Sequence, residues 1–476
     1  MSEPNHSNVC PQYGREHAAK NYTLPTVLLI YSIICTIIPI SFHTQEIEKA
    51  YTALVVSSWI YTILIFLVYN NRRLDIFEPY VLIALLHIMI FLVSPVRSIW
   101  IDDLEHRAGA YTFGGAIKGT IIALISFTIF TILYEICYPR VIAAKETETD
   151  ENTDKTEINP SRAVIFSLVI WTIGFVSAII FLSLRGMSLT YVLSLGQNGD
   201  FNDDLTTNSA YSFLSVVSNL AFGSWLIYYR YGKNRLLVWL LFFATIATLV
   251  VRGYRIYILI FIVSPAIYRY LILKTRPKVR SMVLLLIALI IMVGLIGWSR
   301  AALRNNNDIN LSEFNYDEIK GAVWGNFDIY KSYYGVVENI PQKMYYTKGQ
   351  QMFSYTMLLF VPRQIWPSKP EPIIKEVVAT CICEYAAQAG SAFPTLGEWY
   401  QEFGIIGCFL FSALAGGLLC QLNRWLQSED EIDLLLYSLA LPSLMQLVIR
   451  GYTPSNFWLI VTMLVPIRML KGPLKK

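Results

Sequence analysis

Arginines that interrupt long apolar stretches are the residues of this chain best suited to chemistry. We single out Arg252, Arg255, Arg363 and Arg450, because each lies beside or close to a glycine or proline at a break in the apolar pattern. A guanidinium next to hydrocarbon costs about 3 kcal/mol at a helix centre, so it tends to persist where an anion pairs with it. Its planar fork fits phosphate oxygens. These arginines therefore predict a shared phosphate-binding site. The alternative is that each one extends separately to the lipid headgroups.

Carboxylates and aromatic rings late in the chain are the other candidates. Glu398 and Glu402 are four residues apart, so on a helix they share one face. Near the arginines, Glu398 could act as a general base; the alternative is that it only complements the dipole at a helix start. Trp366 and Tyr400 are candidate platforms for sugar rings, although core packing explains such aromatics equally well.

The chain lacks the sequence motifs of several other classes of enzyme. The chain has no Walker A loop, no Gly-x-Ser-x-Gly elbow and no His-Glu-x-x-His pair. Cys381 and Cys383 are too close in sequence for an easy mutual disulfide, and no histidine follows His106 to complete a metal site with them. We therefore predict no metal and no cofactor. The absence of a basic, aromatic-interleaved patch argues against nucleic acid.

The composition predicts the elements that carry these residues. Of 476 residues, 55% are hydrophobic and 15% are charged, whereas soluble proteins carry about 25% charged residues. A helix crosses a bilayer with about 20 apolar residues. The chain has about twelve such runs, at 24–42, 51–69, 79–96, 115–138, 163–184, 210–229, 235–251, 256–273, 281–298, 404–420, 432–449 and 454–470. This predicts an all-α polytopic membrane protein. The short break at 252–255 favours a helical hairpin; a single broken element is the alternative.

Lysine and arginine positions predict the orientation. If the N-terminus is cytoplasmic, the cytoplasmic segments hold Arg72, Arg73, Arg140, Lys145, Lys155, Arg162, Arg230, Lys233, Arg235, Arg269, Lys274, Arg276, Lys278, Arg280, Lys471, Lys475 and Lys476. The short loops on the other side hold few. We therefore expect nine spans in 1–298, a large external loop at 299–403, three spans in 404–476, and both termini inside. In a bacterium the loop would face the periplasm from the inner membrane.

The large loop has apolar segments of its own. Residues 314–337 show helix-like apolar spacing with many aromatics, including Tyr330, Tyr333 and Tyr334, which predicts a helix lying along the membrane surface. The apolar run 353–361 is too short to span and predicts a re-entrant or interfacial segment. The prolines that follow it enforce irregular backbone, which is tolerated at membrane depth only where it is buried in protein or lines a cavity.

The order of these features resembles the O-antigen (oligosaccharide repeat unit) polymerases of the Wzy type. The resemblance rests on the long apolar array, the arginine-glycine break at 252–255 and the late external loop. Its motifs are Pro-Arg-x-x-Trp-Pro-x-Lys-Pro at 362–370, Gly-Glu-x-Tyr-x-x-Phe-Gly-x-x-Gly at 397–407, and Arg450-Gly451. In topology it covers the whole chain, and in motifs only about 250–476.

The resemblance implies a fold of the membrane glycosyltransferase C type and a function. Such enzymes join lipid-linked oligosaccharide repeats at the outer face of the inner membrane, in lipopolysaccharide biosynthesis. The growing chain on undecaprenyl pyrophosphate is the donor and a single lipid-linked repeat is the acceptor. Expected partners are a chain-length co-polymerase and the flippase and ligase of the same pathway. Related ligases place a histidine in the large loop as a possible base; this loop has none, which moves that role towards Glu398.

Two alternatives remain at this stage. A flippase for the same lipid-linked oligosaccharide would also have about twelve spans, but it would carry its charges inside the bundle and have short loops. An O-antigen ligase would share the chemistry.

The reaction itself requires few catalytic groups, because pyrophosphate is a competent leaving group that needs only its charge stabilised. The attacking hydroxyl needs positioning and at most one base.

Overall fold

The computed structural model describes most of the chain as separate stretches. They are 23–42, 46–70, 75–100, 112–150, 158–184, 212–252, 255–275, 327–359, 373–382 and 393–471, with residues 277, 278, 280, 281, 284, 324, 361, 365, 366 and 368 between them. Side chains at 23–26, 28, 63–70, 143–150, 212 and 251–255 lie outside the description.

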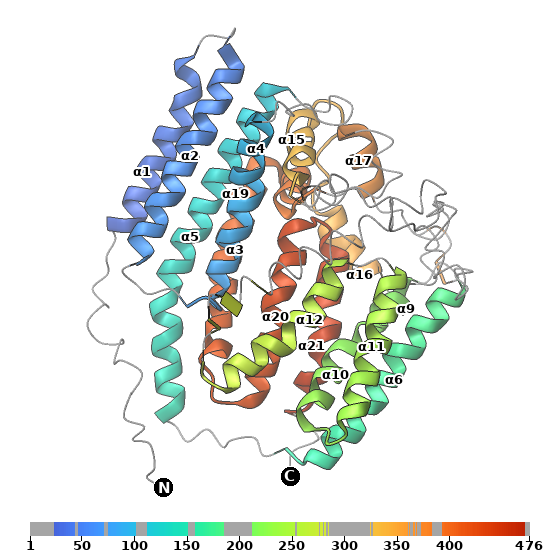
Figure 1. Ribbon diagram of the computed structural model, residues 1–476. Helices are drawn as coiled ribbons and strands as arrows, with labels where there is room; N and C mark the ends of the chain where they lie inside the picture. Colours follow the sequence, from blue (N-terminus) through green and yellow to red (C-terminus); the bar gives the residue numbers. More distant parts are fainter. Residues whose placement is uncertain are drawn as a thin grey trace, which may run out of the picture.

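The elements in these stretches are all helical (Figure 1). The first are α1 (Thr23–Ile37), η1 (Ile38–Ser41), α2 (Ile47–Asn70), α3 (Pro79–Ile88), η3 (Met89–Val93), α4 (Ser94–Trp100), α5 (Phe113–Asp150) and α6 (Pro160–Leu184). Next come α9 (Ser212–Val217), α10 (Leu220–Tyr231), α11 (Arg235–Arg252), α12 (Arg255–Ile272) and α15 (Ile329–Asn339). The last are η5 (Gln350–Tyr355), α16 (Thr356–Leu358), α17 (Ile374–Cys381), α19 (Thr395–Leu426), α20 (Glu431–Ile449) and α21 (Thr453–Met469).

The helices form a bundle with short elements at one end. In Figure 1, α1, α2 and α5 stand on one side and α6, α9, α10 and α11 on the other, with α12, α20 and α21 between them. The short helices α15, α16 and α17 gather towards one end of the bundle. Within the described residues, the helices long and apolar enough to cross a membrane are Pro79–Trp100, Phe113–Ile142, Pro160–Leu184, Thr395–Leu426 and Glu431–Ile449. The prediction of an all-helical polytopic protein is confirmed.

The predicted spans correspond to helices wherever the structure describes them. The run at 210–229 is divided, because α9 ends at Val217 and α10 begins at Leu220. The run at 281–298 lies almost wholly outside the described residues. The break at 252–255 separates two packed helices, since the rings of Phe242 in α11 and Phe261 in α12 stack with centroids 5.1 Å apart. The helical hairpin is therefore the correct interpretation of that break.

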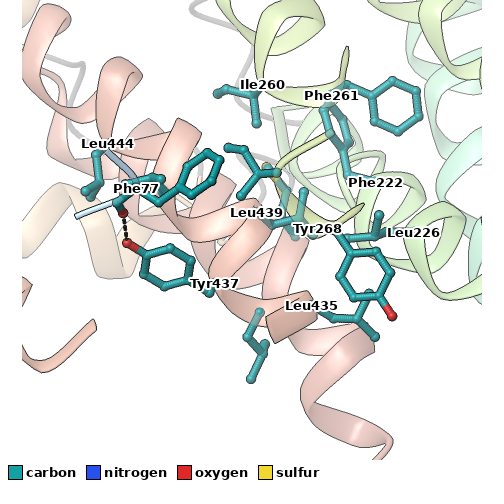
Figure 2. Packing of buried hydrophobic residues seen from close by; sticks show 14 of the residues in the cluster. Phe77, Phe222, Leu226, Ile260, Phe261, Tyr268, Leu435, Tyr437, Leu439 and Leu444 are labelled. Atoms are coloured by element: carbon teal, nitrogen blue, oxygen red, sulfur yellow. Dashed lines mark hydrogen bonds between the residues drawn. The ribbon is translucent and has the colours of Figure 1, made fainter. Parts of the chain in front are cut away.

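The bundle core lies where α10 and α12 pack against α20. Figure 2 shows Phe222 and Leu226 of α10 and Phe261 of α12 beside Leu435 and Leu439 of α20. On another face of α20, the Tyr437 hydroxyl donates a hydrogen bond to the Phe77 carbonyl. In lipid, helices associate through van der Waals packing rather than through exclusion of water. Close approach of the helices therefore decides the stability of the bundle.

Two adjacent glycines of α19 allow this packing to be tested. A Cβ on Gly416 would lie 2.5 Å from the Phe130 carbonyl oxygen of α5, whereas one on Gly417 would meet only the Cys137 sulfur, at 3.8 Å. We expect Gly416→Ala to destabilise the protein by about 1–3 kcal/mol, because two backbones must separate. Gly417→Ala, in the same helix, should be neutral or slightly stabilising. Thermal unfolding of the two variants in detergent checks this, and equal midpoints would contradict it.

The helix expected along the membrane surface is instead buried, at least where it is described. Its described part, α15, packs against α5, α17 and α19. Tyr330, Tyr333 and Tyr334 are each 0% exposed. Their hydroxyls have internal partners: Ser98 Oγ at 2.7 Å, the Gly119 carbonyl at 3.1 Å and Thr120 Oγ1 at 2.7 Å, in that order. The aromatic face of this helix is therefore covered by protein rather than by lipid, because these rings with polar tips find their polar partners inside the protein. Its direction relative to the membrane surface stays a prediction.

The two ends of α20 differ in chemistry. At its first turn, Lys471 pairs with Asp433 at 2.6 Å, and Arg230 pairs with Glu431. Asp430 caps the helix by accepting a hydrogen bond from Ile432 N at 2.9 Å. The other end leads into Arg450, which is exposed. With 19 residues, α20 is about 28 Å long, close to the thickness of bilayer hydrocarbon.

Candidate functional site

The turn between α20 and α21 carries Arg450, and the rest of the protein fixes its backbone. Arg450 N donates to the Gln446 carbonyl at 3.0 Å, and the Asn456 side-chain amide donates to the Arg450 carbonyl at 2.5 Å. Gly451 N donates to the Phe393 carbonyl at 2.7 Å, just before α19 begins. These bonds use main-chain atoms of Arg450 and Gly451, so none of them depends on the exposed guanidinium.

Glu398 lies in the first turns of α19 and contacts the same turn. Thr453 N donates to its two carboxylate oxygens at 2.9 and 3.0 Å, and the Thr453 hydroxyl donates to Oε2 at 2.7 Å. Glu398 is 0% exposed. The predicted Gly-Glu and Arg-Gly motifs are thus neighbours in space, and the carboxylate binds the first residue of α21.

The beginning of α12 lies beside the beginning of α21. The Tyr257 and Ser455 hydroxyl oxygens are 3.4 Å apart. Tyr257 follows Arg255, the first residue of α12, by two positions, and Arg252 is the last residue of α11. The side chains of Arg252 and Arg255 lie outside the description, but their helix ends are placed. The backbone of the arginine hairpin is therefore close to the turn that carries Arg450.

A third segment reaches the same place from the large loop. The run expected to be re-entrant or interfacial forms η5 and α16, which pack against α21. The Trp458 indole N–H donates to the Thr356 carbonyl at 2.8 Å. The rings of Tyr355 and Tyr452 lie 6.5 Å apart, and Leu359 belongs to the same apolar cluster. Arg363 follows Leu359 by four positions and is itself outside the described residues.

The two candidate sugar platforms have different surroundings. Trp366 is 37% exposed, and its indole N–H donates to Ser368 Oγ at 2.9 Å. Tyr400 is 1% exposed. Its hydroxyl lies 2.7 Å from Lys118 Nζ, which donates to it, and 3.3 Å from the Ile340 carbonyl, to which it donates. The Tyr400 ring is therefore covered by protein rather than presented to a ligand.

Cys381, at the end of α17, is a free and buried thiol. Burial raises its pKa to about 12, which keeps the thiol protonated and disfavours metal binding. Cys383 lies outside the described residues.

Thr453 and Gly451 are parts of the site that sequence reasoning did not identify. Thr453 begins α21 and is followed by Pro454, a pattern typical of a helix start. That pattern was available from the sequence, but the carboxylate partner 55 positions away was not. A glycine is required at position 451 because the backbone of Pro394 packs closely against it: a Cβ there would lie 2.7 Å from the Pro394 carbonyl oxygen.

A bundle of apolar helices thus brings the starts of α12, α19 and α21, the end of α20 and a segment of the large loop together at one end. An exposed arginine on a fixed turn at this place can bind an anion. The architecture and the site define a polytopic membrane protein with a candidate anion site at a gathering of helix ends.

Comparison with known proteins supplies the family. The family model for O-antigen polysaccharide polymerase Wzy matches residues 24–476. The chain belongs to this family and is a membrane glycosyltransferase that polymerises lipid-linked repeat units. Among curated proteins and among solved structures, no match to the chain is found. The family resolves the earlier alternatives, since it is a family of polymerases rather than of flippases or ligases.

Proposed function

We propose that this enzyme transfers the growing glycan from undecaprenyl pyrophosphate to the non-reducing-end sugar of a lipid-linked repeat unit, with the diphosphate bound by Arg252, Arg255, Arg363 and Arg450. The observation that carries the proposal is the meeting of three separate segments at the start of α21. These are the turn of Arg450, the α12 end with Tyr257, and the η5–α16 segment with Thr356. Arg450 lies in the first of these segments, Arg255 begins the second, and Arg363 follows the third, four positions after Leu359.

The proposed mechanism is a single in-line displacement. The hydroxyl of the acceptor sugar attacks the anomeric carbon as the bond to the diphosphate oxygen breaks. The diphosphate leaves with the electron pair, the hydroxyl proton is released, and the anomeric centre inverts. Guanidinium groups stabilise the charge that develops on the leaving group. Trp366, which is partly exposed, remains our candidate for a ring that stacks on a sugar.

The surroundings of Glu398, the glutamate expected to act as base, favour a different role. A general base must come within hydrogen-bond distance of the proton that it removes. Glu398 is 0% exposed, and both of its oxygens accept hydrogen bonds from Thr453. This geometry favours a positioning role for Glu398.

We further propose that the site faces the periplasm, from the inner membrane. Support comes from the cations that meet the first turn of α20, Arg230 and Lys471, at the end opposite to Arg450. Cytoplasmic segments are the ones enriched in lysine and arginine. Periplasmic chemistry would give the polymerase its proposed partners: a flippase that supplies the repeat units, a chain-length co-polymerase, and a ligase that uses the product. The glycosyltransferase C type fold remains a prediction.

A deletion strain tests the proposed reaction. Without the polymerase, lipid A should carry single repeat units, because flipping and ligation continue while chain extension stops. Complementation with the intact gene should restore the ladder of long chains on a polysaccharide gel. A deletion strain with no repeat at all on its lipid A would instead indicate a step before polymerisation and would contradict the proposal.

A further inference from the structure

Two carboxylates, one turn apart in α19, are completely buried. Glu398 and Glu402 are each 0% exposed. In the described part of the chain, no lysine or arginine side chain lies within ion-pair distance of either carboxylate. A buried carboxylate is unfavourable unless hydrogen bonds compensate for its lost hydration. The groups that supply these bonds therefore indicate what each glutamate does.

Glu398 is compensated by the first residue of α21. Its partners are the N–H and the hydroxyl of Thr453, at distances of 2.7–3.0 Å. The first N–H groups of a helix have no partner within the helix, and the helix dipole favours a negative charge there. Thr453 is three positions after Arg450. The Glu398 carboxylate thus binds the start of α21, the helix that follows the turn of Arg450.

Glu402 makes the equivalent contacts with a different segment. Its carboxylate accepts hydrogen bonds from Gly349 N and, at 2.9 Å, from Met352 N. The Lys348 N–H also donates to the Glu402 carbonyl at 3.0 Å. Gly349 has a φ of +87°, which favours glycine, and η5 begins directly after it. The segment bound here continues through α16 towards Arg363.

We propose that Glu398 and Glu402 are positioning residues of the polymerase, which fix the turn of Arg450 and the segment leading to Arg363 against one face of α19. The inference rests on the proposed function, because the positions of these arginines matter to turnover only if they bind the lipid diphosphate. Neither glutamate needs to touch the substrate. If a glutamate is lost, the segment that it holds can shift, and a shift of about 1 Å in a binding group is enough to impair a site built from separate segments.

The two glutamates should respond differently to replacement by glutamine. In Glu398→Gln the amide oxygen can accept from Thr453 N while the amide NH₂ donates to the Thr453 hydroxyl, which can reverse its role. In Glu402→Gln one backbone N–H, of Gly349 or Met352, would face the amide NH₂ and lose its acceptor. A general base at Glu398 would give the opposite order, because an amide cannot accept the proton.

The test uses the full-length protein in nanodiscs, with sugar-free undecaprenyl pyrophosphate as the binding probe and the polysaccharide gel as the readout of turnover. We expect Glu398→Gln to stay within about threefold of the parent in both assays. Glu398→Ala should weaken lipid binding about tenfold. In the Arg450→Ala background, Glu398→Ala should cause no further loss, because its effect passes through that arginine. Glu402→Gln should lower polymer yield about tenfold.

Glu376→Gln, an exposed carboxylate on α17, is the matched control and should be silent in both assays. The inference is overturned if Glu398→Gln lowers turnover about 100-fold or more while lipid binding is unchanged, since that is the behaviour of a base. It is also overturned if Glu398→Ala and Arg450→Ala are additive in lipid binding. Unchanged lipid binding in Arg450→Ala alone would instead overturn the proposed anion site.

Discussion

Long-chain polysaccharide is expected to disappear when Arg450 is replaced by alanine, with the protein still present in the membrane at its normal amount. The hydrogen bonds from Arg450 N to the Gln446 carbonyl and from the Asn456 amide to the Arg450 carbonyl use main-chain atoms, and alanine retains both. The substitution removes the guanidinium of a residue that is exposed. A charge-assisted hydrogen bond contributes about 1.5–3 kcal/mol, or roughly 10- to 150-fold, and a diphosphate can accept more than one.

Two further variants make this prediction specific. Arg450→Lys should restore little polymer, because an ammonium group is a point charge without the planar fork of arginine. Arg468→Ala should be normal. Arg468 is an exposed arginine in the last turn of α21, about 25 Å along the helix from the proposed site. The measurement is a gel of surface polysaccharide from complemented deletion strains, alongside the amount of tagged protein. Full-length chains from Arg450→Ala would be inconsistent with an anion site at this turn.

Much of the fold could be predicted because the membrane imposes a simple rule. Apolar runs of sufficient length become helices in lipid, where the backbone must satisfy its own hydrogen bonds. The boundaries were accurate where charges or prolines mark them. The expected run at 432–449 corresponds to α20 at 431–449, preceded by the capping residue Asp430. The run at 404–420 begins at Gly404, whose φ of +66° interrupts α19.

The large loop could be predicted less well, because its sequence permits more than one environment. Aromatic residues at helical spacing suit a membrane surface and a protein interior equally. What decides the position of α15 is a set of partners distant in sequence, such as Ser98 for Tyr330 and Thr120 for Tyr334. No local pattern contains that information. Glu398 is a similar case, since its residue type predicted acid–base chemistry, whereas its carboxylate accepts hydrogen bonds from Thr453, 55 positions away.

The candidate site was predictable as a set of residue types and not as a geometry. Breaks in apolar runs identified Arg450 and the hairpin at 252–255 without any structure. The contact between the Gly-Glu motif and the Arg-Gly motif was not predictable, because it depends on how α19 packs against the end of α20. The hydrogen bond from Gly451 N to the Phe393 carbonyl, at 2.7 Å, joins the backbone of this turn to the residues just before α19.

That link leads to the second large effect, the loss of activity expected for Gly451→Ala. An ideal Cβ on Gly451 would lie 2.7 Å from the Pro394 carbonyl oxygen and 3.0 Å from the Pro394 carbonyl carbon and Thr395 Cα. All three are main-chain atoms at the start of α19, so no flexible side chain can move aside. The turn and α19 must separate, which costs about 1–3 kcal/mol and lengthens the hydrogen bonds between Thr453 and Glu398.

Because the displaced turn carries Arg450, the damage should reach activity before it reaches folding. We expect Gly451→Ala to lower polymer yield about 100-fold, which is the scale for a catalytic group moved by about 1 Å, while most of the protein remains folded in the membrane. Gly417→Ala provides the comparison, since its Cβ would meet only the Cys137 sulfur at 3.8 Å. Polysaccharide gels and thermal unfolding of both variants separate the two effects. If Gly451→Ala polymerises normally, the close packing of this turn on α19 is not what fixes Arg450, and the coupling between the two motifs must be abandoned.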